Sequence, residues 1–467
     1  MKKKFCLLFV VFVNLFTIFA QDSLAIANDC EVLKEYLQEA SIDVSMAIDE
    51  GLIDIDDVIQ KIKDEYDSVK NKDKRDKKNS KGIYPEIFAR SIRKILSKEL
   101  PYKNLHMWIK SKNYSEDMFD NQFVFYSQVY FEKKGNEYFV EESNVRSIKK
   151  GMKYTGDEQS LFKVIHNNKE LYRFAVFNYY NQKKAAINIE NKIKKIPVKW
   201  IQNYVKNEEI SYKNTDKSIV ISITTCSPKD LEKFRKTVSE IRKQLETTDK
   251  MVIIDLRNNR GGLVSNIYYI IYSLLLSPSE ENLVNFNGIL NYVTQNHYEL
   301  NTQKIRDRVL VDGNKEKFTR LKLDKNKYVK GYGSLDNSKQ VKIKIDNPKY
   351  KKNLYILTNN NTASAAEDFI FYSKKLYDKT ILIGENTNGC IVFGDPYRYS
   401  LPDSKISLDL MATDNRQCIA LLSGRNWKGE GNGFYPDYWA TSEEIVETMV
   451  YLTKDEELRK VILTGKQ

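Results

Sequence analysis

The sequence predicts an α/β protein whose layered core fills the C-terminal half of the chain. Between Ser218 and Gly384, apolar runs of strand length alternate with amphipathic helical patterns, as in a sheet covered by helices. Before this core, a helical region extends to about residue 115, and a strand-rich region covers about 120–200. The chain has 467 residues, of which 41% are hydrophobic and 30% charged, so it can form several packed domains.

The N-terminal region is expected to be helical. Apolar residues of the segment 28–70, such as Leu33 and Leu37, recur three and four positions apart. The charged stretch 71–82 predicts an exposed linker. A second helix is expected over about 85–100, and it ends at the proline that follows.

The remaining elements follow from short apolar runs and turn residues. Residues 123–198 predict short strands that form a small unit of their own. The polar residues 280–350 predict an insertion or lid within the core. The core itself is expected to contain strands from Ser218, at Met251–Leu256, at 353–358 and at Thr380–Gly384, with helices from Leu231, from Asn266 and over Ser364–Leu376. We therefore predict three domains, at 21–115, 120–200 and 201–467.

The N-terminus predicts export. Lys2, Lys3 and Lys4 precede an apolar run from Phe5 to Ala20, which is short for a membrane span and typical of a signal peptide of residues 1–20. Cleavage after Ala27 and an uncleaved anchor are the alternatives. No other segment is long enough to span a bilayer, so we expect no stable membrane span after cleavage. The mature protein is then periplasmic, attached to the cell envelope or extracellular.

Charge and composition exclude several kinds of partner and cofactor. The net charge is +12, but the basic residues are scattered and no arginine stripe with interleaved aromatics occurs, so we expect no nucleic-acid binding. There are only three histidines, all far apart, and no CxxC motif, so no metal site is predicted. No phosphate loop or dinucleotide fingerprint is present, and no cofactor is expected.

The cysteines allow two interpretations. Cys6 leaves with the signal peptide, which leaves Cys30, Cys226, Cys390 and Cys418 in an oxidising compartment. A disulfide between Cys390 and Cys418 would join neighbouring strands. Free buried thiols are the other interpretation.

Ser364 is the best candidate nucleophile. It follows a buried strand and a polar turn and stands at the start of a helix, where backbone N–H groups stabilise negative charge. A helix-capping serine is the simpler interpretation of this segment alone. The N–H groups of Gly261 and Gly262, in a turn after another buried strand, are expected to form an oxyanion hole together with that of Ala365.

Five motifs, in this order, resemble the tail-specific, tricorn-like serine peptidases of the C-terminal processing peptidase superfamily. They are DLRNNRGG (Asp255–Gly262), TASAAE around Ser364, GENTNG (Gly384–Gly389), SLPDS from Ser400, and EGNGFYPD (Glu430–Asp437). The resemblance covers about 218–440. It implies a ββα spiral core of the ClpP/crotonase type and a PDZ-like peptide-binding domain at 120–200.

The same family implies a choice between two catalytic designs. The Ser–Lys design places its lysine just after the TxG turn, where this chain has Cys390. The tricorn-like design uses an upstream histidine as base and a glutamate near the final PD motif, and these positions match His106 and Glu430. His166 and His297 fit the motif less well. This chain departs from the family pattern at Leu105, where tricorn-like enzymes have serine.

The resemblance also assigns supporting roles and a function. Asp255 and Arg257 are expected to form a structural ion pair, and Glu367 to position the helix. An imidazole can take the serine proton and return it to the leaving amine, and a carboxylate can orient that imidazole. We therefore expect an exported serine endopeptidase that cleaves peptides or unfolded protein tails. The alternative is an inactive protein that keeps the peptidase fold and binds peptides or hydrophobic ligands.

Overall fold

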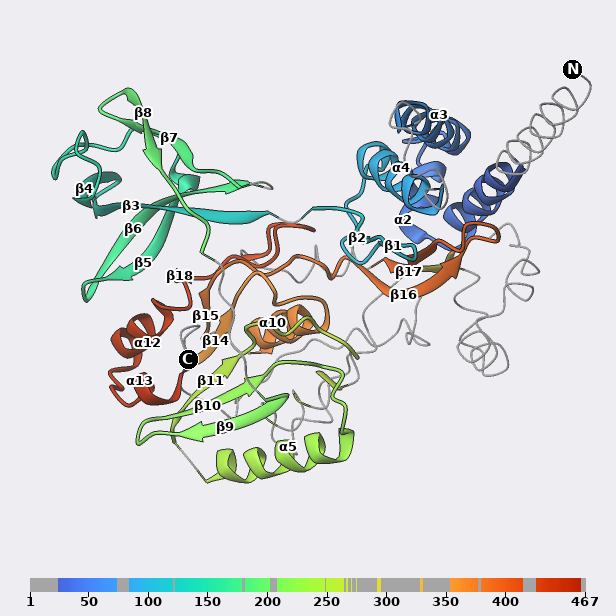
Figure 1. Ribbon diagram of the computed structural model, residues 1–467. Helices are drawn as coiled ribbons and strands as arrows, with labels where there is room; N and C mark the ends of the chain where they lie inside the picture. Colours follow the sequence, from blue (N-terminus) through green and yellow to red (C-terminus); the bar gives the residue numbers. More distant parts are fainter. Residues whose placement is uncertain are drawn as a thin grey trace, which may run out of the picture. The chain divides into compact units, whose positions relative to one another are not determined.

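The computed structural model of the chain contains two compact units (Figure 1). Unit 1 comprises Met1–Phe119, Ile289–Asp336 and Val392–Cys418, and unit 2 comprises Asp120–Gly288, Asn337–Ile391 and Ile419–Gln467. The described residues are 24–73, 84–120, 122–178, 181–201, 208–247, 249–263, 353–376, 379–414 and 426–462, with short pieces inside 266–330. The segment 392–418, which the sequence places in the core, thus belongs to the same unit as the N-terminal helices.

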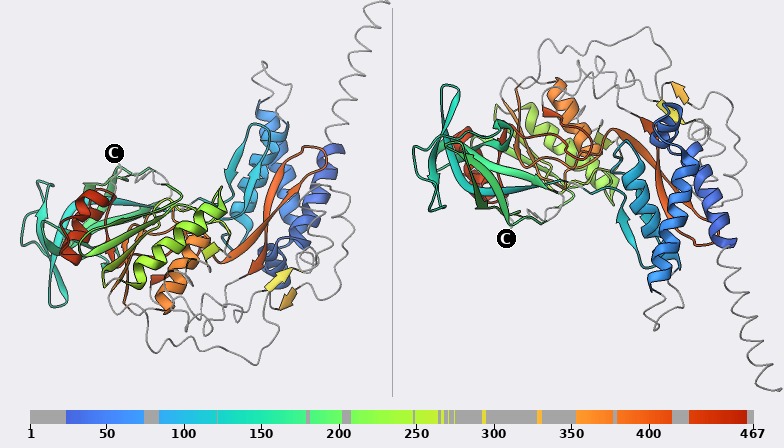
Figure 2. Two further views of the ribbon diagram at one scale, coloured as in Figure 1. Left: turned by 90° about the horizontal axis from the view of Figure 1, so that it is seen from below. Right: turned by 90° about the horizontal axis from the view of Figure 1, so that it is seen from above.

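Unit 1 combines helices with an antiparallel sheet. Its elements are a helix over 24–39, α2 (Ile42–Asp49), α3 (Ile55–Asp73), α4 (Tyr84–Glu99), β1 (Trp108–Lys110), β2 (Ser115–Asp117), β12 (Tyr292–Thr294), β13 (Tyr328–Lys330), β16 (Phe393–Ser400) and β17 (Ser407–Asp414). Strand β17 pairs with β1, β12 and β16. In both views of Figure 2, the blue N-terminal helices lie beside the orange β16–β17 hairpin.

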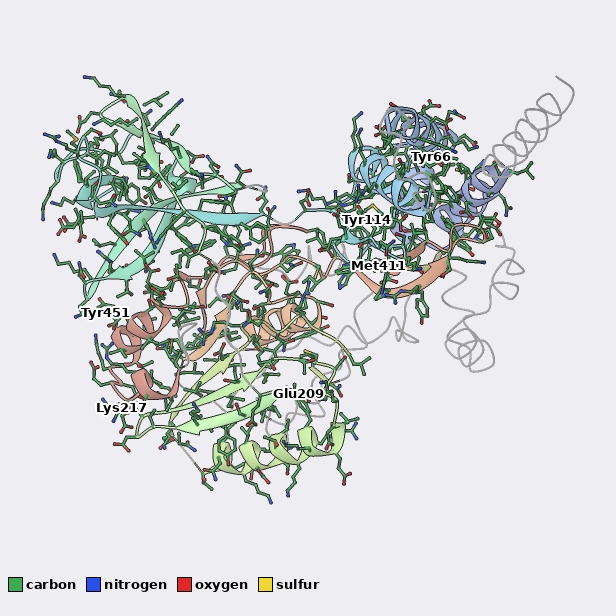
Figure 3. All side chains as sticks on the ribbon, in the orientation of Figure 1. Tyr66, Tyr114, Glu209, Lys217, Met411 and Tyr451 are labelled. Atoms are coloured by element: carbon green, nitrogen blue, oxygen red, sulfur yellow. The ribbon has the colours of Figure 1, made fainter. Side chains whose placement is uncertain are left out.

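The helices of unit 1 bury the apolar faces that the sequence predicts. In α4, the residues at helical spacing from Ile87 to Leu96 are buried. Tyr66 of α3, labelled in Figure 3, packs edge-on against Phe88 with ring centroids 5.8 Å apart. The buried carboxylate of Asp29 accepts the backbone N–H groups at the tip of the β16–β17 hairpin, which fixes the first helix to that hairpin.

Unit 2 contains a six-stranded sheet. Its strands are β9 (Ile210–Asn214), β10 (Ser218–Ile223), β11 (Met251–Asp255), β14 (Leu354–Thr358), β15 (Thr380–Gly384) and β18 (Tyr438–Trp439). They lie in the order β18-β15-β14-β11-β10-β9, and all but β9 run parallel. The central strands are almost wholly buried, as expected for parallel strands covered on both faces. Their carboxyl ends meet at one edge of the sheet, and the segments that follow them are brought together there.

Helices cover the faces of this sheet. They are α5 (Leu231–Glu246), α10 (Ala365–Leu376), α12 (Ile445–Thr453) and α13 (Leu458–Val461). The buried side of α5 begins at Phe234, and the side chain of Asp230 caps the helix by accepting the N–H of Lys233 at 2.9 Å. Apolar residues of α12 pack on the sheet residues Val220, Ile253 and Leu357.

The strand-rich part of unit 2 holds two smaller sheets. Its elements are β3 (Phe123–Lys134), β4 (Glu137–Ser143), η1 (Glu158–Ser160), β5 (Leu161–His166), β6 (Lys169–Asn178), β7 (Lys184–Ile189) and β8 (Lys192–Pro197). Strands β4, β3, β6 and β5 form an antiparallel sheet, and β7 pairs with β8. The four-stranded sheet packs on the segment around β18, where Phe162 stacks on Trp439 with ring centroids 4.2 Å apart.

The predicted mixed α/β class with an N-terminal helical region is confirmed. Cys30, Cys226 and Cys390 are free and buried, whereas Cys418 lies outside the described residues. The predicted signal peptide and most of the linker and insertion also lie outside them. Among the helices that the structure describes, none combines the length and hydropathy needed to cross a bilayer.

Candidate active site

The glycine turn after β11 lies against the turn that carries Ser364. The Ala363 N–H donates to the Asn259 carbonyl at 2.9 Å, and the Thr362 hydroxyl donates to the Leu256 carbonyl at 2.9 Å. A Cβ atom placed on Gly261 would lie 2.7 Å from the Ser364 Cβ. Glycine is required here because any side chain would enter the space of the candidate nucleophile.

Ser364 has a backbone conformation that is rare for a residue other than glycine. Its φ is +55°, in the left-handed region, and α10 starts at the next residue. Such a turn between strand and helix carries the nucleophile in other hydrolase folds, because it projects the hydroxyl away from the backbone and beside the helix N-terminus. A simple helix-capping serine has an extended backbone instead.

Glu367 holds this turn in place. Its buried carboxylate accepts the N–H groups of Ser364 at 3.0 Å, Gly389 at 2.7 Å and Cys390 at 2.8 Å. It also accepts the hydroxyl of Thr387. Burial raises the pKa of Glu367, while these four hydrogen bonds act in the opposite direction. The predicted positioning role of Glu367 therefore extends beyond α10 to the TNG turn.

Two of the three predicted oxyanion-hole donors keep their N–H groups available. The Gly261 N–H donates to Asn259 Oδ1 at 2.9 Å, within its own turn. By contrast, no described residue accepts a hydrogen bond from the N–H of Gly262 or Ala365. Gly261 lies close to the second of these, since a Cβ on it would be 2.9 Å from the Ala365 nitrogen. Gly262 and Ala365 thus remain as the two predicted donors whose N–H groups are available.

The turn that carries Glu430 joins the same hydrogen-bonded frame. The Gly431 N–H donates to the Gly389 carbonyl at 2.8 Å, and the Phe434 N–H donates to the Thr387 hydroxyl at 2.7 Å. Glu430 lies close enough to Cys390 for its charge to raise the pKa of that thiol. Unit 2 therefore brings Glu430, the TNG turn, the glycine turn and Ser364 together.

Cys390 occupies the position of the lysine in the Ser–Lys design. Burial, followed by the charges of Glu367 and Glu430, raises its pKa well above the ordinary value, and the Ser364 N–H bonds to the sulfur. The thiol therefore stays protonated at neutral pH and cannot act as a base. The absence of a Ser–Lys dyad stays a prediction.

The ion pair predicted in the DLRNNRGG motif is confirmed. The Arg257 guanidinium donates to both oxygens of Asp255, at 2.9 and 2.6 Å, and both side chains are fully buried. Such a paired arrangement stabilises a turn only while both partners are present. The Asp255–Arg257 pair thus stabilises the start of the turn that leads to Gly261 and Gly262.

His106 lies in unit 1, between α4 and β1. Its backbone N–H donates to Asn104 Oδ1 at 3.2 Å, and Asn104 Nδ2 donates to the buried carboxylate of Asp43 at 2.9 Å. Asn104 therefore fixes the backbone of His106. Burial lowers the pKa of His106 to about 4, while a hydrogen bond with the Phe393 backbone acts in the opposite direction.

The other histidines have different surroundings. His166, on β5, stacks on Tyr130 with ring centroids 3.9 Å apart, and its Nε2 pairs with Glu142 at 3.1 Å. His297 lies outside the described residues. Within the described ranges, no group of three or more histidine, cysteine or acidic side chains is placed to bind a metal ion.

Residues 217–419 match the model of peptidase family S41. This segment of the chain belongs to peptidase family S41. The S41 segment contains the glycine turn, Ser364 and the TNG turn, whereas His106 and Glu430 lie outside it. The family match confirms the predicted family and the predicted class, a serine-type peptidase, and it supports the crotonase-like core. The histidine-dependent branch stays a prediction.

Solved structures resemble this chain at low identity. A lipoprotein from Streptococcus agalactiae is 18% identical, with 53% of this chain and 70% of that chain covered and a TM-score of 0.31. Mature CPAF complexed with lactacystin is 12% identical, with 94% of this chain and 98% of that chain covered and a TM-score of 0.41. The tricorn protease is 13% identical, with 87% of this chain and 34% of that chain covered and a TM-score of 0.31. No curated protein matches the chain.

Sequence reasoning missed two residues of the site. The Asn259 side chain accepts the Gly261 N–H and donates to the Ile223 carbonyl at 3.0 Å, so it joins the glycine turn to β10. The Thr387 hydroxyl bridges Glu367 and the Phe434 N–H. Both residues lie inside motifs that the sequence analysis noted, but Ile223 is 36 positions from Asn259, and Phe434 is 47 positions from Thr387.

Proposed function

We propose that this protein is an exported endopeptidase that cleaves peptides or unfolded protein tails through an acyl-enzyme on Ser364. The observation that carries the proposal is the conformation of Ser364, at φ +55° directly before the available N–H group of Ala365. The hydroxyl attacks the scissile carbonyl, and the two N–H groups stabilise the resulting oxyanion. Water then hydrolyses the ester and restores the serine.

His106 is proposed as the general base, with Glu430 as its orienting carboxylate. A neutral imidazole takes the serine proton during attack and returns it to the leaving amine. The lowered pKa of His106 supports this role because it keeps the ring neutral over the physiological range. The protonated thiol of Cys390 supports it too, since no other base from the family's two designs is present in the described site.

The test is a Ser364→Ala variant assayed on an unfolded polypeptide and with a fluorophosphonate probe. We expect a loss of cleavage of at least about 10³-fold and no labelling. Ser239→Ala, at an exposed serine of α5, is the matched control and should behave as the unchanged protein. Full activity in Ser364→Ala would disprove the proposed nucleophile. Absence of both cleavage and labelling in the unchanged protein would instead favour the inactive, ligand-binding alternative.

A further inference from the structure

The β7–β8 hairpin concentrates positive charge in a short piece of chain. Residues 181–200 contain six lysines, at positions 183, 184, 192, 194, 195 and 199, and one acidic residue, Glu190. The excess is therefore +5 within this segment, compared with +12 over the 467 residues of the chain. Positive charge is thus concentrated on this hairpin.

Local structure leaves these lysines without neutralising partners. Within the described part of the chain, none of the six forms an ion pair, and five of them are exposed. Lysines of the neighbouring four-stranded sheet region do form ion pairs. The Nζ of Lys150 lies 2.7 Å from a carboxylate oxygen of Glu141, and that of Lys163 lies 2.9 Å from one of Glu170. Glu190, at the hairpin turn, accepts the backbone N–H of Lys153.

The register of the hairpin divides its strand lysines between two faces. Side chains of β7 such as Ile187 and Ile189 are buried in the strand-rich core, so their neighbours along the strand face outward. The outward pairs are Lys184 with Pro197, Ala186 with Lys195, and Asn188 with Ile193, whereas Lys194 and Lys192 pair with Ile187 and Ile189 on the other face. Ile193 is 76% exposed, and it lies next to Lys192 near the turn. Figure 1 shows the hairpin as the paired green strands β7 and β8.

We propose that the outward face and the tip of this hairpin, with Lys184, Lys195, Ile193 and the tip residue Lys192, dock on an anionic lipid surface. Lysines near such a surface add their attraction almost independently, and a projecting isoleucine can enter the boundary between headgroups and acyl chains. A specific protein partner is less well matched, because stable protein interfaces bury about 1,200 Å² or more. Strands β7 and β8 have only 6 residues each, so one face of the ribbon is small.

The test is co-sedimentation of the full chain with vesicles, without substrate. Vesicles of phosphatidylcholine containing phosphatidylglycerol should bind the protein, those of phosphatidylcholine alone should not, and added salt should weaken binding. The triple variant Lys184→Gln, Lys192→Gln and Lys195→Gln should lose at least about tenfold in affinity. Ile193→Ser should weaken binding without changing its dependence on salt.

A second triple variant provides the matched control. Lys233→Gln, Lys236→Gln and Lys243→Gln removes the same charge from exposed positions on α5 and should change vesicle affinity by less than about threefold. Equal losses in both triple variants would show that net charge alone attracts the protein and would overturn the proposal. The proposal would also be overturned if the protein did not bind anionic vesicles, or if it bound polyglutamate but not the vesicles. Because no catalysis is measured, Ser364→Ala should bind vesicles normally whether or not the proposed function is correct.

Discussion

The carboxylate of Glu367 accepts four hydrogen bonds, three from backbone N–H groups and one from a hydroxyl. These donors come from the Ser364 turn and from Thr387–Cys390, so a single side chain sets the position of two motifs. A carboxylate suits this set because it offers only acceptors. The unusual φ of Ser364 is therefore maintained by contacts of the surrounding residues.

Glu367→Gln tests this positioning role. Glutamine replaces one acceptor oxygen by an NH₂ group that faces N–H donors, so we expect a loss of about 3 kcal/mol in the free energy of unfolding. The rate of fluorophosphonate labelling at Ser364 should fall at least tenfold even where the variant is fully folded. Glu232→Gln, at an exposed acid of α5, should alter neither quantity. Labelling at the unchanged rate in folded Glu367→Gln would exclude the role.

The pKa of His106 predicts the pH dependence of activity. Burial lowers this pKa to about 4, and the base works only when neutral, so kcat/KM should rise as the pH increases through about 4. No second rise is then expected near the ordinary histidine pKa of about 6.5. A pH–rate profile measured on the unchanged protein and on His166→Ala checks this. A rise near 6.5 that persists in His166→Ala would show that His106 is not a buried base.

At the scale of elements, the site consists of segments that follow parallel strands. The glycine turn follows β11, the Ser364 turn follows β14 and the TNG turn follows β15. Because these strands are parallel neighbours, their segments meet at one edge and approach closely enough for direct backbone contacts. Gly261, with φ +88°, has the closest approach to the nucleophile turn.

Gly261→Ala should destabilise the protein strongly. Its Cβ would lie 2.7 Å from both the Ala363 carbonyl oxygen and the Ser364 Cβ, and alanine disfavours the positive φ. We expect a loss of about 3 kcal/mol in the free energy of unfolding. Gly135→Ala is the control, because Gly135 has φ +62° but no atom within 4 Å of its added Cβ, so only about 1 kcal/mol should be lost. Equal losses in chemical denaturation would disprove the close approach.

At the scale of the whole molecule, a buried arginine joins the strand-rich sheet of unit 2 to its C-terminal segment. Arg173 of β6 donates to Glu444 at 2.9 Å and to the Ser127 carbonyl at 2.7 Å. Its guanidinium lies 4.7 Å from the ring centroid of Tyr126. With the Phe162–Trp439 stack, these contacts make the strand-rich sheet and the segment after Glu430 one packed structure.

Arg173→Ala should therefore weaken unit 2. The substitution removes a buried cation and leaves Glu444 without this partner, so we expect a loss of about 3 kcal/mol in the free energy of unfolding. Arg459→Ala breaks an exposed pair with Glu447 and should change the free energy of unfolding little, because water and salt screen exposed ion pairs. Urea denaturation of both variants checks the difference. A loss in Arg173→Ala no larger than that in Arg459→Ala would show that the pair does not join these parts.

The helices and strands followed well from local patterns. The helix expected over about 85–100 is α4, at Tyr84–Glu99, and the helix expected over Ser364–Leu376 is α10, which starts one residue later. Side-chain periodicity and turn residues act over a few positions, so they can be read along the chain. The offset at Ser364 has a physical reason, because its backbone is left-handed and does not belong to the helix.

The motifs of the site were also predictable, because Gly261, Gly262 and Ser364 need particular backbone freedom or chemistry at fixed positions. The hydrogen-bond partners of these residues were not predictable from the sequence. That Glu367 joins two motifs depends on contacts with residues 20 to 23 positions away, and that the Gly261 N–H is taken by Asn259 depends on the conformation of the glycine turn. The sequence alone therefore determined the fold class, the helices and strands, and the residue types available for catalysis. Only the tertiary structure decided which N–H groups stay available and where charge gathers on the surface, because parallel strand ends and hairpin register bring distant residues together.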